Sequence, residues 1–408
     1  MSLLTFFQQL SSDSSEERIL LLFDLTATQP SPESKFHGGS EYAKQIFFSS
    51  VEKGYRDFVC VYDKNKELDE KIKKACQENH IEMIEVDSDS ALVSLVNSNR
   101  FSTFYSALPY HLYDIDTSNV QFIMTVHGLR EIECSYDPVQ WHYRKGMMSK
   151  LKLLIKRALF RNKEWNTYYD RFGRLLNKKN IKIITVSEHS KYSMLCFYPN
   201  LEKESIYVSP APCPFGKEEP KLANEYAHIS QYSRQFFLLV SANRWMKNNY
   251  RAIKALDDFY RKNPDCELKT VVLGKKDPHP GIENIEKFIF IDYVDYDSLD
   301  WFYKNAFAFI YPSLNEGYGY PPLQAMHYGT PVIAAAVSSI PEVCKDNVVY
   351  FNPVNINEIE NRISQLYHNK ELYHRLSLSG KKNAMDVSNL QTAKWDKLLD
   401  IIFNSNAH

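Results

Sequence analysis

The first half of the chain alternates short apolar runs with longer stretches of mixed polarity. Runs of this length and composition predict buried strands, and the mixed stretches between them predict helices. The expected strands are Ile19 to Leu25, Phe58 to Tyr62, Ile81 to Val86, Phe101 to Tyr105, Gln121 to Val126, Ile181 to Val186 and Ser205 to Val208. The expected helices include Glu41 to Lys53, Lys66 to Glu78 and Ala91 to Asn97. Strands that alternate with helices predict a parallel sheet covered on both faces.

The same alternation restarts after a proline-rich stretch, Pro210 to Pro220, which predicts a linker. The later strands are expected at Phe236 to Val240, Leu268 to Leu273, Phe288 to Ile291, Phe307 to Tyr311, from near Pro331, and at Val348 to Phe351. The later helices are expected at Asn249 to Arg261, Ser298 to Asn305, Pro321 to Tyr328, Ile356 to Met385 and Leu390 to Phe403.

This pattern predicts an α/β protein with two doubly wound, Rossmann-like domains. We expect an N-terminal domain at 1–208, a linker at 209–235, a C-terminal domain at 236–388 and a final helical segment at 389–408. In such folds, ligands bind at the carboxyl ends of the strands, here facing a cleft between the domains.

Composition bounds the class of protein. With 408 residues the chain can form two cores of roughly 200 residues each. Hydrophobic residues make up 44% and the formal net charge is −1, which indicates a soluble globular protein with no global bias toward nucleic acid. Seven scattered cysteines without a Cys-x-x-Cys pair favour reduced thiols over disulfides or structural zinc. No run reaches the ~18 apolar residues of a membrane span, and Met1 to Glu17 is too polar for a signal peptide, so we expect a cytoplasmic protein.

One stretch in the second half carries a candidate anion site. The predicted strand Phe307 to Tyr311 is followed by the polar loop Asn315 to Tyr320 and then by a helix with proline in its first turn. Gly317 and Gly319 permit backbone angles and close approaches that a side chain would obstruct. This arrangement places Glu316 and the amides of residues 317–320 where a helix N-terminus can receive an anionic group. An ordinary β-α turn is the alternative explanation of the glycines.

The residues around this loop also carry a family resemblance. They are Pro312-Ser313, Glu316-Gly317-Tyr318-Gly319-Tyr320-Pro321, Gln324, Ala325-Met326 and Gly329-Thr330-Pro331-Val332-Ile333. This set resembles the signature of the family 4 (group 1) retaining glycosyltransferases, a nucleotide-sugar-dependent family with the GT-B fold. At Gln324 the family has a second Glu, which accepts hydrogen bonds from the ribose hydroxyls. A Gln keeps one carbonyl acceptor but loses the charge-assisted grip on a vicinal diol, so we expect Gln324 to bind the nucleoside more weakly.

The resemblance implies catalytic roles for two residues. Glu316 corresponds to the family's Glu beside the donor sugar. His127 follows the predicted strand Gln121 to Val126 and corresponds to a His that contacts the same sugar. A lone His is more often structural, but this one ends a strand that faces the predicted cleft.

Two cations after the strand Phe236 to Val240 are candidates for binding phosphate. Arg244 and Lys247 lie near the first turn of the next expected helix, where positive charge opposes the helix dipole and therefore suggests an anion to neutralise. The resemblance implies that they clamp the donor diphosphate and stabilise the charge of the leaving group. The expected diphosphate-binding set is Arg244, Lys247, Gly317, Tyr318, Gly319 and Tyr320. A solvated loop is the alternative.

The resemblance extends to three further places. It implies that Tyr293 and Val294 contact the nucleobase, largely through backbone groups, and that Gly38 and Gly39 form a loop lining the cleft. Glycines in a plain turn are the alternative for the last two. It also implies that the last helix crosses back onto the first domain.

Acidic residues elsewhere offer a competing metal hypothesis. Another glycosyltransferase fold holds Mn²⁺ or Mg²⁺ with an Asp-x-Asp pair, and this chain has three such pairs, Asp87/Asp89, Asp114/Asp116 and Asp295/Asp297. Such short matches are common by chance, and Arg, Lys and a helix terminus can neutralise a diphosphate, so we expect no metal and no cofactor beyond the nucleotide-sugar co-substrate. Glu342 also follows the family pattern, although a carboxylate at a helix start explains it equally well.

The segment Arg144 to Lys179 is strongly basic, with 12 Lys or Arg and two acids, Glu164 and Asp170. Apolar residues within it follow helical spacing, and most of the cations lie off that face. One hypothesis is a surface that draws the protein to anionic lipid. The alternative is a solvated helix whose apolar face packs on the first domain. Nucleic-acid binding ranks below both because it would need aromatic residues placed for stacking.

Together with these observations, the family resemblance implies a metal-independent retaining glycosyltransferase. We expect it to move a sugar from a nucleoside diphosphate to an acceptor hydroxyl, on a saccharide or lipid-linked acceptor in surface polysaccharide or glycolipid assembly. We expect it in the cytoplasm, with peripheral membrane contact through the basic segment. The alternatives are a nucleotide-sugar epimerase of the same fold and a non-catalytic GT-B subunit.

Overall fold

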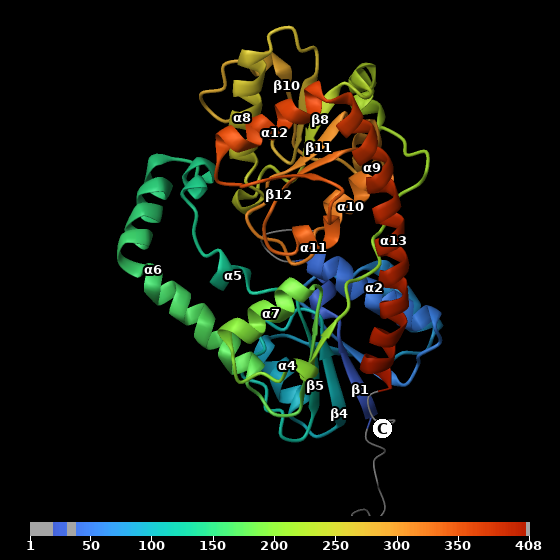
Figure 1. The fold of residues 1–408 in the computed structure, drawn as a ribbon. Coiled ribbons are helices and arrows are strands. Elements are labelled where there is room, and N and C mark those ends of the chain that lie inside the picture. Colours follow the sequence, from blue (N-terminus) through green and yellow to red (C-terminus); the bar gives the residue numbers. More distant parts are fainter. Residues whose placement is uncertain (1–18, 31–37, 405–408) are drawn as a thin grey trace, which may run out of the picture.

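The computed structural model describes residues 19–30 and 38–404, which form two α/β lobes stacked end to end (Figure 1). The stretch Met1 to Glu17 lies outside the described residues. The N-terminal lobe contains a seven-stranded sheet in the order β3-β2-β1-β4-β5-β6-β7, in which every pairing is parallel. Its strands are β1 (Ile19–Asp24), β2 (Phe58–Asp63), β3 (Met83–Val86), β4 (Phe101–Ser106), β5 (Gln121–Val126), β6 (Ile181–Thr185) and β7 (Ile206–Val208).

The C-terminal lobe contains a six-stranded sheet in the order β10-β9-β8-β11-β12-β13, again with parallel pairing throughout. Its strands are β8 (Phe236–Leu239), β9 (Lys269–Leu273), β10 (Phe288–Ile291), β11 (Ala308–Tyr311), β12 (Val332–Ala335) and β13 (Val349–Phe351). The predicted fold class of two doubly wound domains is confirmed, and every strand expected from the sequence is present with ends shifted by at most two residues.

Helices connect the strands in both lobes. The N-terminal lobe has η1 (Thr26–Thr28), α2 (Gly38–Glu52), α3 (Glu70–Glu78), α4 (Asp89–Val96), α5 (Arg130–Glu133), η2 (Pro138–Tyr143), α6 (Met147–Leu176), α7 (Glu188–Phe197) and η3 (Lys203–Ser205). The C-terminal lobe has η4 (Asn224–Tyr232), η5 (Trp245–Lys247), α8 (Asn249–Lys262), η6 (Ile285–Lys287), α9 (Tyr296–Asn305), α10 (Tyr320–His327), α11 (Ile340–Cys344), α12 (Ile356–His368) and α13 (Lys370–Phe403). No helix among these is both long and apolar enough to cross a membrane.

Each sheet has one topological switch point, the strand at which the direction of the chain connections reverses. In the first sheet β1 lies between β2 and β4, and in the second β8 lies between β9 and β11, so the connections leave in opposite directions at these strands. In doubly wound folds such switch points open a crevice at the strand carboxyl ends. The loops that follow β1, β4 and β5 meet the loops that follow β8 and β11 between the two lobes.

The end of the chain departs from the expected helices. The sequence predicts one helix over Ile356 to Met385 and another from Leu390, whereas the chain breaks at Asn369 and then continues as one helix to Phe403. The Asn369 side chain caps α13 by accepting a hydrogen bond from the Leu372 amide.

The continuous helix α13 joins the two lobes. Its buried apolar face runs from Leu376 in the C-terminal lobe to Trp395 and Phe403 beside the N-terminal one. The indole of Trp395 donates a hydrogen bond to Ser49 on α2 (3.0 Å), and Phe403 stacks on Tyr55. The apolar core is therefore continuous from one lobe to the other along this helix.

A second crossing lies on the opposite side of the molecule (Figure 1). After β5 the chain reaches up to the C-terminal lobe through η2 and returns to β6 along the 30-residue helix α6. There Asp137 forms an ion pair with Arg251 of α8 (2.7 Å), and both side chains are largely buried. His142 stacks on Tyr250 at a ring distance of 3.6 Å, which packs η2 against the second lobe.

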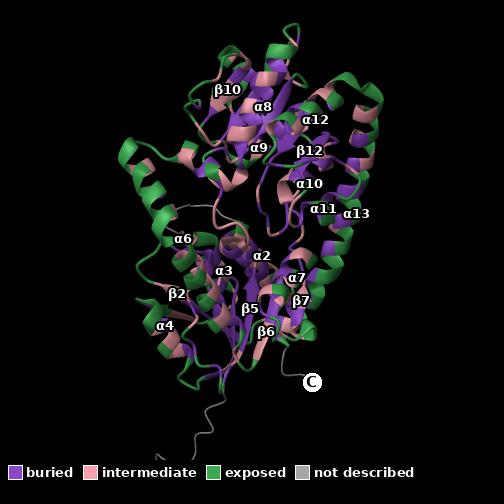
Figure 2. Cartoon of the chain, turned by 60° about the vertical axis from the view of Figure 1, so that its left-hand side comes forward, coloured by how far each residue is buried: buried purple, intermediate pink, exposed green. Residues whose placement is uncertain are grey.

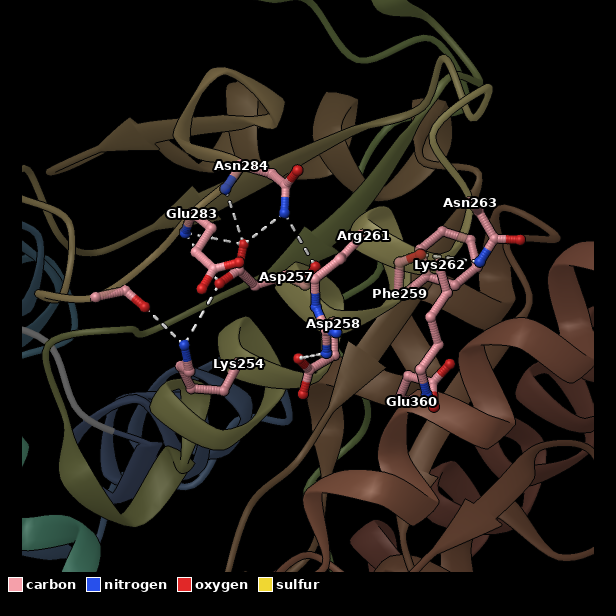
Figure 3. A network of polar contacts seen from close by, with 11 residues as sticks. Lys254, Asp257, Asp258, Phe259, Arg261, Lys262, Asn263, Glu283, Asn284 and Glu360 are labelled. Carbon is pink, nitrogen blue, oxygen red and sulfur yellow. Dashed lines mark hydrogen bonds and ion pairs between the residues drawn. The ribbon is translucent and has the colours of Figure 1, made fainter.

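Behind the second sheet, a buried carboxylate holds a loop to α8 (Figure 3). Asp257 accepts hydrogen bonds from the amides of Glu283 and Asn284, and Lys254 links it to the carbonyl of Gly281. Burial by itself would raise the pKa of Asp257, but these hydrogen bonds and the Lys254 ammonium lower it. Both carboxylate oxygens are engaged in the lobe's own structure, so Asp257 is a structural residue.

Candidate active site

A cavity of about 900 Å³ lies between the lobes. Eleven of the residues singled out from the sequence line it: Gly38, Gly39, His127, Arg244, Lys247, Glu316, Gly317, Tyr318, Gly319, Tyr320 and Gln324. Tyr293 and Val294 are not among the lining residues, and the Tyr293 side chain is 63% exposed. The neighbouring Tyr296 and Leu299 of α9 line the cavity instead.

The centre of the cavity wall is a buried ion pair. Lys247, at the end of η5, donates to Glu316 Oε1 at 2.6 Å and to the Tyr311 hydroxyl at 3.1 Å. The side chains of Lys247 and Glu316 are 12% and 10% exposed, so both charges are largely out of water. The Glu316 backbone is held as well, because its N–H donates to Ser338 Oγ and its carbonyl accepts from Ser339 Oγ.

The charges around Glu316 keep it ionised. Burial by itself would raise its pKa, but Lys247 and then Arg130 outweigh that effect and lower the pKa to about 2. Arg130 comes from α5 of the N-terminal lobe and lines the cavity. Arg244 also lines the cavity and acts on Lys247. Lys247 and Arg130 therefore act on the Glu316 carboxylate and Arg244 acts on Lys247, so these four side chains together carry a surplus of positive charge.

The start of α10 adds hydrogen-bond donors beside these cations. Gly319 is the N-cap residue with φ +112°, a conformation that L side chains rarely adopt, and no side chain caps this helix end. Pro321 and Pro322 have no N–H group, so the backbone donors at this end are confined to residues 317–320. Amides at a helix N-terminus attract anions through the helix dipole.

The two lobes touch at the glycine loop. A Cβ atom on Gly317 would lie 2.2 Å from the carbonyl oxygen of His127, so only glycine permits this approach between the lobes. Ser190 of α7 lies beside the same loop and would meet a Cβ on Gly128 at 3.4 Å. The distance between the two walls of the cavity therefore depends on Gly317 having no side chain.

His127 is held by its own lobe. Its Nε2 lies 3.1 Å from the carbonyl oxygen of Ala107, and since a carbonyl can only accept, Nε2 carries the proton. The backbone N–H of His127 donates to the Tyr110 hydroxyl (2.8 Å), and the ring of Tyr42 packs edge-on at 5.0 Å. Gly39 lies on the same side, where a Cβ would be 3.5 Å from His127 Nε2. Gly38 and Gly39 line the cavity from the first turn of α2, so the prediction that they form a loop ahead of this helix is wrong.

Gln324 lies on α10 at the edge of the cavity. Its Nε2 is 3.4 Å from the carbonyl oxygen of Pro214 in the linker. Because the amide nitrogen faces the linker, the side-chain oxygen remains as the acceptor for a hydroxyl group.

The Asp-x-Asp pairs have structural partners. Asp295 accepts from the amide of Ser298 and caps α9. The partners of the others are Lys64 for Asp87, His111 for Asp89, Arg174 for Asp114, Ser118 for Asp116 and Lys217 for Asp297. Within residues 19–30 and 38–404, no group of three or more His, Cys, Asp or Glu is placed to hold a metal ion.

Glu342 lies at a contact between the lobes. Its carboxylate accepts hydrogen bonds from the amides of Glu188 and His189, each at 3.1 Å, and so caps α7 of the other lobe. Close by, Asn315 donates to Glu133, which also faces His189. The structure thus gives Glu342 an inter-lobe role.

Arg130 is the functional candidate that sequence reasoning missed. It follows His127 by three residues, and its Nε is buried without a hydrogen-bond partner among the described residues. The only signal in the sequence was a cation just past a strand end that already carried a candidate His. Arg130 acts on Glu316 because of the way the two lobes dock. Local sequence patterns do not predict this docking.

Comparison with known proteins supports the family resemblance of the loop before α10 in the second lobe. Residues 227–383 match the family model described as "Glycosyl transferases group 1". Over 190 residues the chain is 29% identical to the O-antigen chain mannosyltransferase RfbU of Salmonella typhimurium, a match that covers 45% of this chain. The match spans about half of that relative's own length, 51%.

Solved structures share the whole fold. Sucrose-phosphate synthase from Thermosynechococcus elongatus superposes with a TM-score of 0.64 at 14% identity, covering 94% of this chain and 99% of that one. HepE of Anabaena, in complex with UDP and glucose, superposes with a TM-score of 0.60 at 14% identity, covering 92% and 98%. At this level of identity the likeness concerns the fold.

Proposed function

The chain belongs to the group 1 glycosyltransferases with the GT-B fold, and on that basis we propose that it is a retaining, metal-independent glycosyltransferase. It transfers a sugar from a nucleoside diphosphate to an acceptor hydroxyl. The observation that carries the proposal is the buried carboxylate of Glu316 held by Lys247 and Arg130, in a cleft that both lobes build and that Arg244 also lines.

The donor diphosphate is assigned to the cations and the glycine loop. An ammonium group has three N–H donors, and Lys247 uses two of them on Glu316 and Tyr311, so the third can reach a phosphate oxygen. Arg244 and the amides of residues 317–320 supply further donors. Donors fixed in place before the reaction stabilise the charge that develops on the leaving diphosphate without reorganisation.

The sugar lies between Glu316 and His127 in this proposal. Attack comes from the face that the phosphate leaves, a phosphate oxygen takes the proton of the acceptor hydroxyl, and the anomeric configuration is retained. Approach of the lobes at Gly317 excludes water and holds the acceptor close to the anomeric carbon. The cations supply the charge stabilisation, so no metal ion takes part in the step.

On the acceptor side, we propose a saccharide or lipid-linked saccharide in surface polysaccharide or glycolipid assembly. The name of RfbU, an O-antigen chain mannosyltransferase, supports this class of acceptor. The complex of HepE with UDP and glucose supports a nucleotide-sugar donor. Peripheral contact with an anionic membrane through Arg144 to Lys179 is a separate proposal, and nucleic acid is not an expected partner.

A ligand panel tests the donor. Thermal unfolding is followed with UDP, GDP and dTDP and with their sugar derivatives, because a ligand at 100 times its Kd stabilises the native state by about 2.7 kcal/mol. We expect one base and one sugar to raise the Tm far more than the others, and turnover of that donor to survive EDTA. The absence of any shift at millimolar concentration would contradict the proposal.

Turnover then separates the alternatives. A transferase releases nucleoside diphosphate and forms an α- or β-linked product whose configuration, read by NMR, matches that of the donor. An epimerase would convert the donor without an acceptor, and a non-catalytic subunit would bind the donor without consuming it.

A further inference from the structure

The first half of α6 exposes a stripe of large apolar side chains. Met147, Met148 and Leu159 are 75%, 67% and 72% exposed. The other exposed members of the stripe are Leu151, Leu154 and Ile155. Figure 2 shows this part of the helix as almost wholly exposed. The alternative expected from the sequence, that this apolar face packs on the first domain, is therefore wrong for the first half of the helix.

The charges on this half are arranged in two rows. At ~100° per residue, the apolar stripe from Met147 to Leu159 spans an arc of about 140°. One flank of the stripe carries Lys150, Arg157 and Arg161, and the other carries Lys152, Lys156 and Lys163. Lys152, Arg161 and Lys163 take part in none of the ion pairs recorded between described residues.

The inner side of the same half is anchored to the protein. Leu153 is 6% exposed, and Arg157 donates to the carbonyl of Ser135 (3.0 Å) and to Gln140 Oε1 (2.7 Å). Ser135 and Gln140 belong to the crossing that Asp137 ties to the C-terminal lobe. The exposed stripe is therefore carried on a fixed support.

The second half of α6 is packed and reaches the cleft. Phe172, Leu175 and Leu176 are buried in the N-terminal lobe, and the Trp165 indole donates to the carbonyl of Ile132. Arg171 lines the cavity together with Phe172 and Leu175. One helix thus joins the exposed stripe to the wall of the candidate active site.

We propose that the apolar stripe of Met147 to Leu159 lies in the surface of an anionic lipid bilayer, with Lys152, Arg161 and Lys163 on the lipid phosphates. This docking places the cleft wall of α6 next to the membrane that carries the acceptor. The identity of the acceptor rests on the proposed function, whereas the docking itself does not.

The charge pattern favours lipid over a second copy of the chain. If two copies met through this stripe, their rows of cations would repel each other. An anionic bilayer would attract the same cations. Amphipathic helices that lie in the membrane interface have this arrangement, with apolar side chains facing the lipid and Lys or Arg residues on the polar face.

The test is sedimentation with vesicles of phosphatidylglycerol and phosphatidylcholine, compared with phosphatidylcholine alone. We expect binding to the anionic vesicles that weakens with added salt. The triple variant Leu151→Ser/Leu154→Ser/Leu159→Ser should bind at least about tenfold more weakly, and Lys152→Gln/Arg161→Gln/Lys163→Gln should lose affinity similarly. The matched control is Leu378→Ser/Leu390→Ser on α13, which removes two exposed leucines away from the stripe and should bind as wild type.

Three results would overturn the proposal. They are no binding to anionic vesicles, equal binding by wild type and the triple Ser variant, and a dimer in light scattering that the triple Ser variant dissociates. The thermal shift given by the donor nucleotide separates this test from that of the proposed function. A Ser variant that keeps the shift but loses vesicle binding supports docking alone, whereas a wild type that binds vesicles without a donor shift contradicts only the transferase.

Discussion

The two walls of the cleft differ in how their functional groups are held. On the C-terminal wall, Glu316 and Lys247 form a buried ion pair within one lobe. On the N-terminal wall, the His127 backbone bonds to Tyr110 and its ring to a carbonyl, and the Nε of Arg130 has no hydrogen-bond partner among the described residues. The central ion pair of the C-terminal wall therefore forms within one lobe. The N-terminal wall contributes to the charge around Glu316 only because the two lobes are docked.

The largest effect should come from the C-terminal wall. Glu316→Gln removes the buried carboxylate and leaves Lys247 without its ion pair. We expect turnover to fall by about 10²–10³-fold with the fold intact by circular dichroism. Glu342→Gln, which lies at the inter-lobe contact outside the cavity, is the control and should lose far less. Unchanged turnover of Glu316→Gln would remove the central role of this wall.

The ion pair also predicts a pH dependence of stability. The pKa of Glu316 is about 2 in the folded chain against an ordinary value of 4.5. A lowered folded-state pKa contributes stability that is present above the unfolded pKa and is lost as the pH falls through the folded one. Between about pH 5 and pH 2, wild type should lose about 3 kcal/mol relative to Glu316→Gln. Urea unfolding of both proteins measures this difference, and parallel curves would contradict the buried pair.

The contact between the walls is tested at the glycine loop. In Gly317→Ala the new methyl group would collide with the carbonyl of His127, so the lobes must move apart. We expect kcat to fall by about 100-fold, because small displacements of reacting groups carry penalties of this size. Gly38→Ala is the control, since its Cβ would meet no described atom within 4 Å. Equal activity of the two variants would show that the walls do not need to touch at this point.

A smaller effect is expected from the N-terminal wall. Arg130→Met keeps the bulk of the side chain but removes one of three cations, and we expect kcat/KM to fall by about tenfold. Arg171→Met removes a cation that lines the same cavity but is not among those that lower the pKa of Glu316, and it is the matched control. If Arg130→Met weakened donor binding as strongly as Lys247→Met, the division between the two walls would fail.

The smallest effect is expected at the edge of the C-terminal wall. Gln324→Glu restores a second carboxylate oxygen for the ribose hydroxyls and should lower the Kd for the donor by about threefold. Isothermal titration with the donor that the panel selects measures it. A weaker Kd would indicate that the hydrogen bond to Pro214 holds the side chain away from the nucleoside.

Features that depend on residues close together in the chain could be predicted from the sequence better than features that depend on distant residues. Strands and helices were predictable because apolar periodicity reports local burial, and ends such as Gln121–Val126 coincide with the structure. The loop from Asn315 to Tyr320 was predictable because its glycines and prolines act through their own backbone. The break of the last helices was misplaced, because Asn369 was not recognised as the cap that starts α13.

The sequence by itself determined the two parallel sheets, the glycine loop before α10 and the candidate charges after β8 and β11. Only the tertiary structure decided that Arg130 acts on Glu316, that Glu342 caps α7 and that half of the apolar face of α6 remains exposed. Helices and strands are determined by residues close together in the chain, because the spacing of these residues sets which side chains share a face. Contacts between lobes join residues far apart in the chain, 114 positions for Asp137 and Arg251 and 154 for Glu188 and Glu342, and their geometry depends on how the two folded surfaces fit together.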